Sequence, residues 1–403
     1  MSESHHIAAE HTVAADRRDG AFARVMDLPE SEQQFIREAR QVTRIRERAR
    51  QKSAERRQRD LRSIESMANA ILELADGDVG GVRNVDRGEV EFRPGPQEGS
   101  VPIPFQLEPA TYAYERAALL STPRYDVSHL TFPSPIESPD AANNVVHAEY
   151  FDPVGFSGKR PAVVVLHILG ADFPLSRYMA ARLADRGVAA LFVKLPYYGE
   201  RRPAAGPGPV PKKFLSDDVE RTMRSMRQGV CDVRRAASWL ASRPNVDPDR
   251  LGVTGISLGG IVSSLVVSVD PQIKSGALLM AGGDLSKVLW DMPETAPFRK
   301  AWTESGRTVD DLKRLTDPYD PLTYAAGMTG KRVLMIAGNV DEVVPPASAK
   351  ALWEAGGRPP IVWYDCGHYS AVGYLLPAIR RTVEFLGGTN PPEPARSSAD
   401  PAN

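Results

Sequence analysis

From residue 160 onward, short apolar runs alternate with amphipathic stretches. The apolar runs have the length and the β-branched content of strands buried on both faces of a sheet, as in "RPAVVVLHILG" at 160–170. The other runs of this kind are residues 188–196, 250–256, 275–283, 331–338 and 359–367. Apolar positions spaced by three or four predict helices at 174–187, 216–242, 346–356 and 371–388, and one that begins at Leu258. Strands that alternate with helices predict an α/β fold with an open, doubly wound, mostly parallel sheet.

The segments before residue 160 have a different pattern. Residues 130–138 and 144–153 alternate apolar and polar side chains, which is typical of antiparallel strands. Residues 31–75 have helical spacing around a strongly basic stretch, "RIRERARQKSAERRQR". This helix either is solvated and packs its ends on the main domain or on a second copy of the chain, or binds an acidic partner or a membrane surface.

These patterns divide the chain into five expected parts. The parts are a disordered tail at 1–30, the basic helical extension at 31–75, connector and edge segments at 76–143, the main α/β domain at 144–388, and a flexible tail at 389–403. Residues 284–328, within the main domain, are expected to form a largely helical insert.

Composition and charge narrow the class of protein. A hydrophobic content of 42% and a net charge of −1 are typical of a soluble globular protein and give no field that favours nucleic acid. The two cysteines, Cys231 and Cys366, are far apart, which argues against a disulfide framework and fits a reducing compartment. Without a secretory leader or an apolar run of roughly 20 residues, a cytoplasmic location is expected. His5, His6 and His11 have no cysteines or carboxylates in register, so no metal site is predicted.

A serine lies between glycines where a predicted strand meets a predicted helix. Gly255-Ile256-Ser257-Leu258-Gly259 matches the pattern G-x-S-x-G. In this pattern the serine occupies a sharp turn that exposes its hydroxyl, and the glycines allow the strand and the helix to approach. In a doubly wound sheet, binding and catalytic residues lie at the carboxyl ends of the parallel strands. Ser257 is therefore the candidate nucleophile.

A serine hydroxyl needs a base, and the base needs a carboxylate to orient it. His368, in "DCGHY", follows the last predicted strand and is the candidate base. Asp341, in "GNVDEVVPP", follows the strand before it and is the candidate acid. Asp284, after "MAGG", is the reserve acid, and Glu342 is expected to point away if Asp341 points inward. The order serine, aspartate, histidine is the one expected for this arrangement.

An anionic tetrahedral intermediate needs two hydrogen-bond donors. The backbone N–H of Leu258, at the start of the predicted helix, is one candidate. The loop after the first buried strand supplies the other, with Leu169 as the first choice and Ile168 as the next. His167, which begins this loop, is expected to brace it by hydrogen bonds.

With these motifs, residues 145–388 resemble an α/β-hydrolase and are similar to the dienelactone hydrolase and prolyl-oligopeptidase-like branch of that superfamily. The residues that carry the resemblance are Ser257 in "GISLGG", Asp341 in "GNVDEVVPP" and His368 in "CGHY". The resemblance implies acyl transfer to water through an acyl-enzyme, with no metal and no organic cofactor. It also implies that the insert at 284–328 forms a cap, and the alternative is that an amphipathic insert covers the edge of the sheet. Families with a histidine-glycine pair in the first loop have glycine where this chain has Ile168.

Two stretches are candidates for the substrate pocket. The first is "PYYGERRPAAGPGPVPKKF" at 196–214, with Tyr197, Tyr198, Arg201 and Arg202. His167 is a further pocket candidate. The second is the aromatic-rich insert at 284–328. Arginines that face the pocket favour an acidic or polar acyl group, whereas aromatic side chains favour a hydrophobic ester.

The predicted function is hydrolysis of a carboxylic ester, lactone or thioester of a small-molecule acyl substrate by Ser257, His368 and Asp341. Carbon–carbon bond hydrolysis and peptide cleavage are alternatives on the same three residues. A non-catalytic binding or scaffold protein that works through the basic helix at 31–75 is an alternative of another class. Such proteins usually lose one of the three residues, and this chain keeps all of them.

Overall fold

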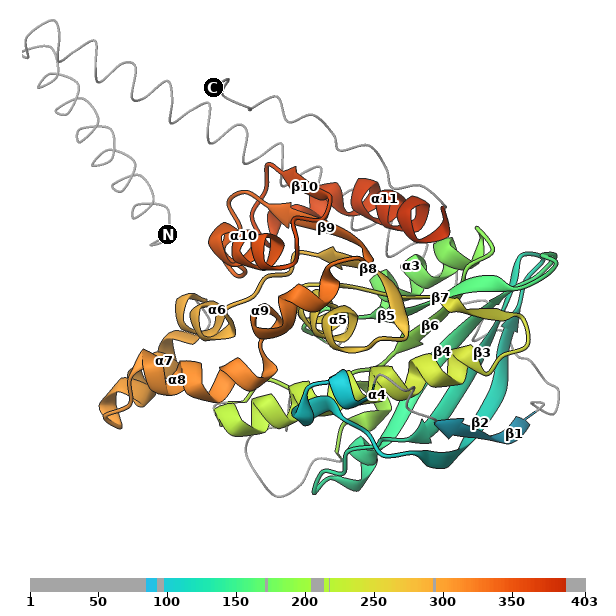
Figure 1. Ribbon diagram of the computed structural model, residues 1–403, viewed down its shortest axis with the longest axis horizontal. Helices are drawn as coiled ribbons and strands as arrows, with labels where there is room; N and C mark the ends of the chain where they lie inside the picture. Colours follow the sequence, from blue (N-terminus) through green and yellow to red (C-terminus); the bar gives the residue numbers. More distant parts are fainter. Residues whose placement is uncertain are drawn as a thin grey trace, which may run out of the picture. The chain divides into compact units, whose positions relative to one another are not determined.

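A ten-stranded sheet forms the centre of the computed structural model (Figure 1), which describes residues 85–92, 98–170, 173–203, 214–216, 218–292 and 295–388. The strand order is β1-β2-β3-β4-β6-β5-β7-β8-β9-β10. The strands are β1 (Val85–Phe92), β2 (Ala110–Ser121), β3 (Tyr125–Pro133), β4 (Val145–Pro153), β5 (Arg160–Leu166), β6 (Ala189–Val193), β7 (Val246–Ile256), β8 (Ile273–Leu279), β9 (Arg332–Gly338) and β10 (Ile361–Tyr364). The six strands from β6 to β10 in this order are parallel, whereas β1 to β4 pair antiparallel with one another, and β4 pairs antiparallel with β6.

Helices follow most of the parallel strands. The α-helices are α3 (Pro174–Ala184), α4 (Val219–Ala241), α5 (Leu258–Val269), α6 (Leu285–Asp291), α7 (Ala296–Glu304), α8 (Val309–Thr316), α9 (Pro321–Tyr324), α10 (Pro346–Ala355) and α11 (Leu375–Gly387). Short 3₁₀ helices are η1 (Glu98–Ser100), η2 (Ile103–Phe105), η3 (Ala141–Asn144), η4 (Gly199–Arg201), η6 (Asp317–Tyr319), η7 (Ala325–Met328) and η8 (Ser370–Tyr374).

The sheet has a separate apolar layer on each face. Val164 and Leu166 of β5 belong to one buried cluster, together with side chains of α4 and α5. Val163 and Val165, which alternate with them, belong to a second cluster with side chains of α3 and α11. Because successive side chains of a strand point to opposite faces, helices cover both faces of β5. The predicted doubly wound, mostly parallel sheet is confirmed for the described residues.

Strands β1 and β2 extend the sheet further than the connector and edge segments expected at 76–143. In β2, buried Tyr112 and Tyr114 alternate with exposed residues, so only one face of this strand is covered. Tyr114 packs edge-on against Trp239 of α4, with 5.8 Å between the ring centroids. The sheet also continues across residue 144, because β3 pairs with β4 from Tyr125↔Pro153 to Pro133↔Val145.

The insert at 284–328 is helical and holds its own small cluster. Trp302 and Leu312 from the insert pack with Val219 and Met223 at the start of α4. The buried carboxylate of Asp320, the N-cap of α9 near the end of the insert, accepts hydrogen bonds from the backbone N–H groups of Asp284 and Leu285 at the start of the insert and from that of Leu322. These contacts join the start of the insert to its end. The role of the insert as a cap remains a prediction.

Two sets of expectations fall outside the described residues. They are those for the tails and the basic helix, at 1–75 and 389–403, and those for His5, His6 and His11. Among the helices that the structure describes, none combines the length and the apolar character needed to cross a membrane.

Candidate active site

Ser257 occupies the turn between β7 and α5 in a strained backbone conformation. Its φ of 55° and ψ of −116° lie outside the regions that residues with a side chain ordinarily adopt. Its N–H donates to the carbonyl of Leu279 in β8 over 2.9 Å, and its carbonyl accepts from Ile261 over 2.9 Å. The neighbouring strand and the helix thus hold the turn from both sides and leave the hydroxyl to point away from the sheet.

The glycines on either side of Ser257 are required by close backbone contacts. A Cβ on Gly255 would lie 2.5 Å from the carbonyl oxygen of Gly259. A Cβ on Gly259 would lie 2.7 Å from the carbonyl oxygens of both Leu166 and His167 at the end of β5. Any side chain at these positions would push α5 away from β7 or from β5.

Ser257, His368 and Asp341 form a continuous hydrogen-bonded chain. The Oγ of Ser257 lies 2.9 Å from Nε2 of His368. On the other side of the ring, Nδ1 of His368 lies 2.9 Å from Oδ2 and 3.1 Å from Oδ1 of Asp341. With Nδ1–H donating to the carboxylate, Nε2 is left to accept the serine proton. The structure therefore brings together the three residues that the sequence singled out for nucleophile, base and acid.

The loops that follow β9 and β10 hold Asp341 and His368 in place. The backbone N–H groups of Val343 and Val344 each donate to Oδ1 of Asp341 over 2.8 Å. The two loops also bond to each other, since Val340 N–H donates to the carbonyl of Cys366 over 3.2 Å. Asp341 is almost completely buried, with 2% of its side chain exposed, so water does not compete for the contact with His368.

Glu342 has a positioning contact that sequence reasoning did not find. Its Oε2 accepts a hydrogen bond from the backbone N–H of His368 over 2.8 Å. The side chain therefore holds the backbone of the residue that carries the imidazole, while Asp341 holds the imidazole itself. The contact joins two loops that are distant in the sequence, so only the folded structure reveals it.

Asp284, the reserve acid, has a different place. It is the N-cap of α6, where its Oδ1 accepts from Lys287 N–H over 3.2 Å and from the Ser286 hydroxyl over 2.7 Å. No hydrogen bond joins it to His368 among the described residues. Its contacts are those of a helix cap, and Asp341 alone of the two aspartates lies against the histidine.

The oxyanion candidates lie on both sides of the serine turn. Leu258 is the first residue of α5, where backbone N–H groups have no acceptor within the helix and the helix dipole favours negative charge. Ile168 and Leu169 lie in the loop directly after β5, the strand next to β7. Leu169 is 42% exposed and Ile168 is half-buried. The choice between these two for the second donor stays a prediction.

His167 braces the loop after β5. Its Nδ1 lies 2.7 Å from the carbonyl oxygen of Ile168, and its Nε2 accepts from the backbone N–H of Leu195 over 3.0 Å. Burial lowers the pKa of His167 to about 4, with Arg201 and Lys194 adding to the effect and the hydrogen bond to Ile168 opposing it. The imidazole is therefore neutral and uses both nitrogens to join the ends of β5 and β6.

Residues 204–213 of the first pocket stretch lie outside the described residues, and Tyr197 and Arg201 are more deeply buried than a pocket wall would be. Arg201 is fully buried; its Nη1 lies 2.8 Å from Oδ2 of Asp232, and its guanidinium donates to the carbonyls of Asn143 and Lys194. Tyr197 is 5% exposed, and the guanidinium of Arg221 lies over its ring. Arg201 thus neutralises a buried carboxylate of α4, and the expectation that it binds substrate is not supported.

The other two candidates of this stretch differ from each other. Tyr198 is 7% exposed, packs edge-on against His167, and accepts a weak hydrogen bond from Gly170 N–H over 3.4 Å. Tyr198 therefore packs against the loop after β5 and helps to hold it in place. Arg202 is exposed and stays a candidate for substrate contact.

Comparisons with known proteins agree with this fold. Residues 222–355 match the sequence profile of the prolyl oligopeptidase family, and residues 135–281 match that of alpha/beta hydrolase domain containing 18. An uncharacterized protein of Mycobacterium tuberculosis is 30% identical over 217 residues, which are 52% of this chain and 50% of the relative. A putative carboxymethylenebutenolidase of Salmonella typhimurium is 29% identical over 226 residues, which are 55% of this chain and 72% of that protein.

A solved structure gives the same picture of the fold. An acetyl xylan esterase from Paenibacillus sp. R4 superposes with a TM-score of 0.54 at 18% identity, over 81% of this chain and 93% of the esterase. The chain spans about half the length of the mycobacterial relative.

Proposed function

The chain belongs to the α/β-hydrolase superfamily, and we propose on that premise that it is a serine hydrolase that cleaves a carboxylic ester, lactone or thioester. The observation that carries the proposal is the unbroken chain of hydrogen bonds from Ser257 through His368 to Asp341. The name of the Salmonella relative, a putative carboxymethylenebutenolidase, supports a lactone or ester as the bond cleaved.

The reaction follows from the positions of these groups. Ser257 Oγ attacks the substrate carbonyl while its proton passes to Nε2 of His368. The positive charge that forms on the imidazole is stabilised by the carboxylate of Asp341 at Nδ1. The N–H of Leu258 and one N–H of the loop after β5 stabilise the negative oxygen of the tetrahedral intermediate. His368 then gives the proton to the leaving alcohol or thiol, and a water molecule repeats the sequence to release the acid.

Replacing Ser257, Asp341 and Asp284 in turn tests the assignment. Hydrolysis of p-nitrophenyl esters of increasing acyl length is the measurement, with circular dichroism as the control for folding. We expect Ser257→Ala to lower kcat by roughly 10⁶-fold and Asp341→Asn by roughly 10⁴-fold. Asp284→Asn keeps a side chain that can cap α6, so it should change kcat little. Equal losses in the two aspartate variants, or a larger loss for Asp284→Asn, would contradict the assignment of the acid.

A p-nitroanilide panel run beside the esters separates the bond types. Faster turnover of amides than of esters would favour peptide cleavage over ester hydrolysis as the function of the protein. A well-folded wild-type protein with no turnover of any member would favour the binding role of the basic segment.

A further inference from the structure

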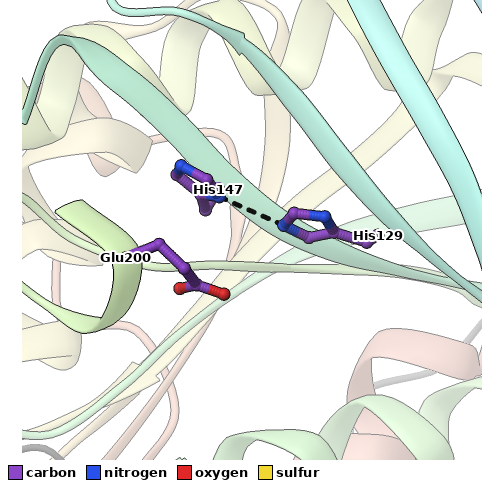
Figure 2. Close-up of side chains that lie close together, drawn as sticks. All are labelled: His129, His147 and Glu200. Atoms are coloured by element: carbon purple, nitrogen blue, oxygen red, sulfur yellow. Dashed lines mark hydrogen bonds between the residues drawn. The ribbon is translucent and has the colours of Figure 1, made fainter. Parts of the chain in front are cut away.

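Three side chains with metal-ligating atoms meet at β3, β4 and η4, and the proposed hydrolysis uses none of them. They are His129 on β3, His147 on β4 and Glu200 on η4. One ligand atom from each lies within 4.8 Å of the others. Figure 2 shows the two imidazoles facing each other across a hydrogen bond, with Glu200 extending from η4 beside them. Both histidines are half-buried, and Glu200 is exposed.

The two imidazoles are already spaced nearly as two ligands of one ion. Nε2 of His129 and Nδ1 of His147 are 3.1 Å apart, and the rings stack with 26° between their planes. Two nitrogens bound to a tetrahedral zinc ion at about 2.0–2.1 Å lie roughly 3.3 Å from each other. Each neutral imidazole can carry its proton on its other ring nitrogen, so both facing nitrogens can present a lone pair.

The carboxylate of Glu200 is held by a neighbouring lysine. Nζ of Lys194 lies 2.7 Å from Oε1 and 2.8 Å from Oε2 of Glu200, and 3.5 Å from Oε1 of Glu149. Glu149 in turn receives two hydrogen bonds of 2.7 Å from Arg177. A carboxylate has about four lone-pair sites, and ligating carboxylates commonly accept a further hydrogen bond. Lys194 can therefore keep its contact with Glu200 while another lone pair of the carboxylate binds the ion.

We propose that His129, His147 and Glu200 bind a divalent transition-metal ion of the zinc class. Two imidazoles and one carboxylate form a donor set that suits zinc, cobalt and nickel, and three protein ligands leave a coordination position for water. Lys194 offsets the negative charge of Glu200, and Glu149 pairs with Lys194 and Arg177, so the affinity comes from the donor geometry rather than from a net negative field.

The ion would tie η4 to the antiparallel part of the sheet. The backbone before η4 already reaches the candidate active site, because Leu195 N–H donates to His167. Binding would therefore stiffen the segment from Leu195 to Glu200 that supports the loop after β5. This proposal is independent of whether Ser257 is a nucleophile, and its test does not use hydrolysis.

Titration of the full chain with Co²⁺, after removal of metal with a chelator, tests the site. Wild type should bind one Co²⁺ per chain with the visible absorption of a low-coordinate ion, and Zn²⁺ should displace it. Glu200→Gln, a near-isosteric change on an exposed residue, and His129→Ala should each weaken binding at least about tenfold. A variant with His5, His6 and His11 replaced by alanine is the matched control, and it should bind as wild type does.

A second readout keeps the proposal testable if His129→Ala does not fold. At one fixed concentration, Zn²⁺ should raise the thermal unfolding midpoint of wild type and of the triple-histidine control by the same amount, and that of Glu200→Gln by less. No stoichiometric binding by wild type, equal binding by wild type and Glu200→Gln, or loss of binding in the triple-histidine control would each overturn the proposal.

Discussion

At the scale of single residues, the candidate site depends on one strained serine and two restrained loops. The turn at Ser257 was predictable because glycine is the only residue that fits at 255 and 259, and this requirement is visible in the sequence. The sequence distinguishes Asp341 from Asp284 less clearly, because both aspartates follow a strand. The structure separates them by their partners: Asp341 contacts His368, and Asp284 caps a helix.

Buried His167 should make the stability of the fold depend on pH. Its pKa is about 4 in the folded chain, against an ordinary value of 6.5. Between pH 6.5 and 4 the unfolded chain therefore binds a proton that the folded chain does not. The free energy of unfolding should fall as the pH drops through this window, by about 3 kcal/mol in all for this residue.

His167→Gln is the comparison that isolates this effect. Glutamine offers an amide donor and acceptor but does not titrate. Urea unfolding at pH 7 and at pH 5 should show a smaller loss of stability in the variant than in wild type. Burial also lowers the pKa of His147 to about 4, so a loss of the same sign should remain in both proteins. An identical pH dependence in the two would contradict the account of His167.

At the scale of elements, a buried ion pair joins η4 to α4. Arg201 of η4 and Asp232 of α4 are both completely buried, and Asp232 also accepts from the hydroxyl of Ser134 over 2.6 Å. From the sequence, Arg201 was predicted to contact the substrate. Its true partner, Asp232, lies 31 positions further along the chain, so no local pattern indicates the ion pair. Only the folded structure brings the two together. The ligand cluster of His129, His147 and Glu200 was hidden for the same reason.

Replacing Arg201 should therefore change stability rather than substrate preference. Arg201→Met leaves the carboxylate of Asp232 buried without its partner, which costs about 3–5 kcal/mol in the free energy of unfolding. Arg202→Met is the matched control on an exposed neighbour and should cost less than about 0.5 kcal/mol. The ratio of KM for acidic and neutral acyl esters should stay the same in Arg201→Met as in wild type. A selective rise of KM for the acidic ester in Arg201→Met would indicate instead that Arg201 contacts the acidic acyl group of the substrate.

At the scale of the whole molecule, the parallel part of the sheet was predictable and its antiparallel part only in outline. Strands β5, β6 and β9 and the carboxyl-terminal parts of β7 and β8 are nearly continuous buried runs, and their order along the chain gives the βαβ pattern directly. Strands β1 and β2 carry a weaker signal, because only alternate residues are buried, as at Tyr112 and Tyr114. Their place follows from pairing with β3, which is a contact between distant residues that no local pattern expresses.

The central claim is that Ser257 is an activated nucleophile at the carboxyl edge of this sheet. The most direct test is labelling of the full chain with a fluorophosphonate, followed by peptide mass spectrometry to find the modified residue. We expect one label, on Ser257. It should be lost in His368→Ala, where the serine lacks its base, and kept in Ser264→Ala, which removes another serine of α5. A well-folded wild-type protein that takes no label, or a label on a residue other than Ser257, would contradict this claim.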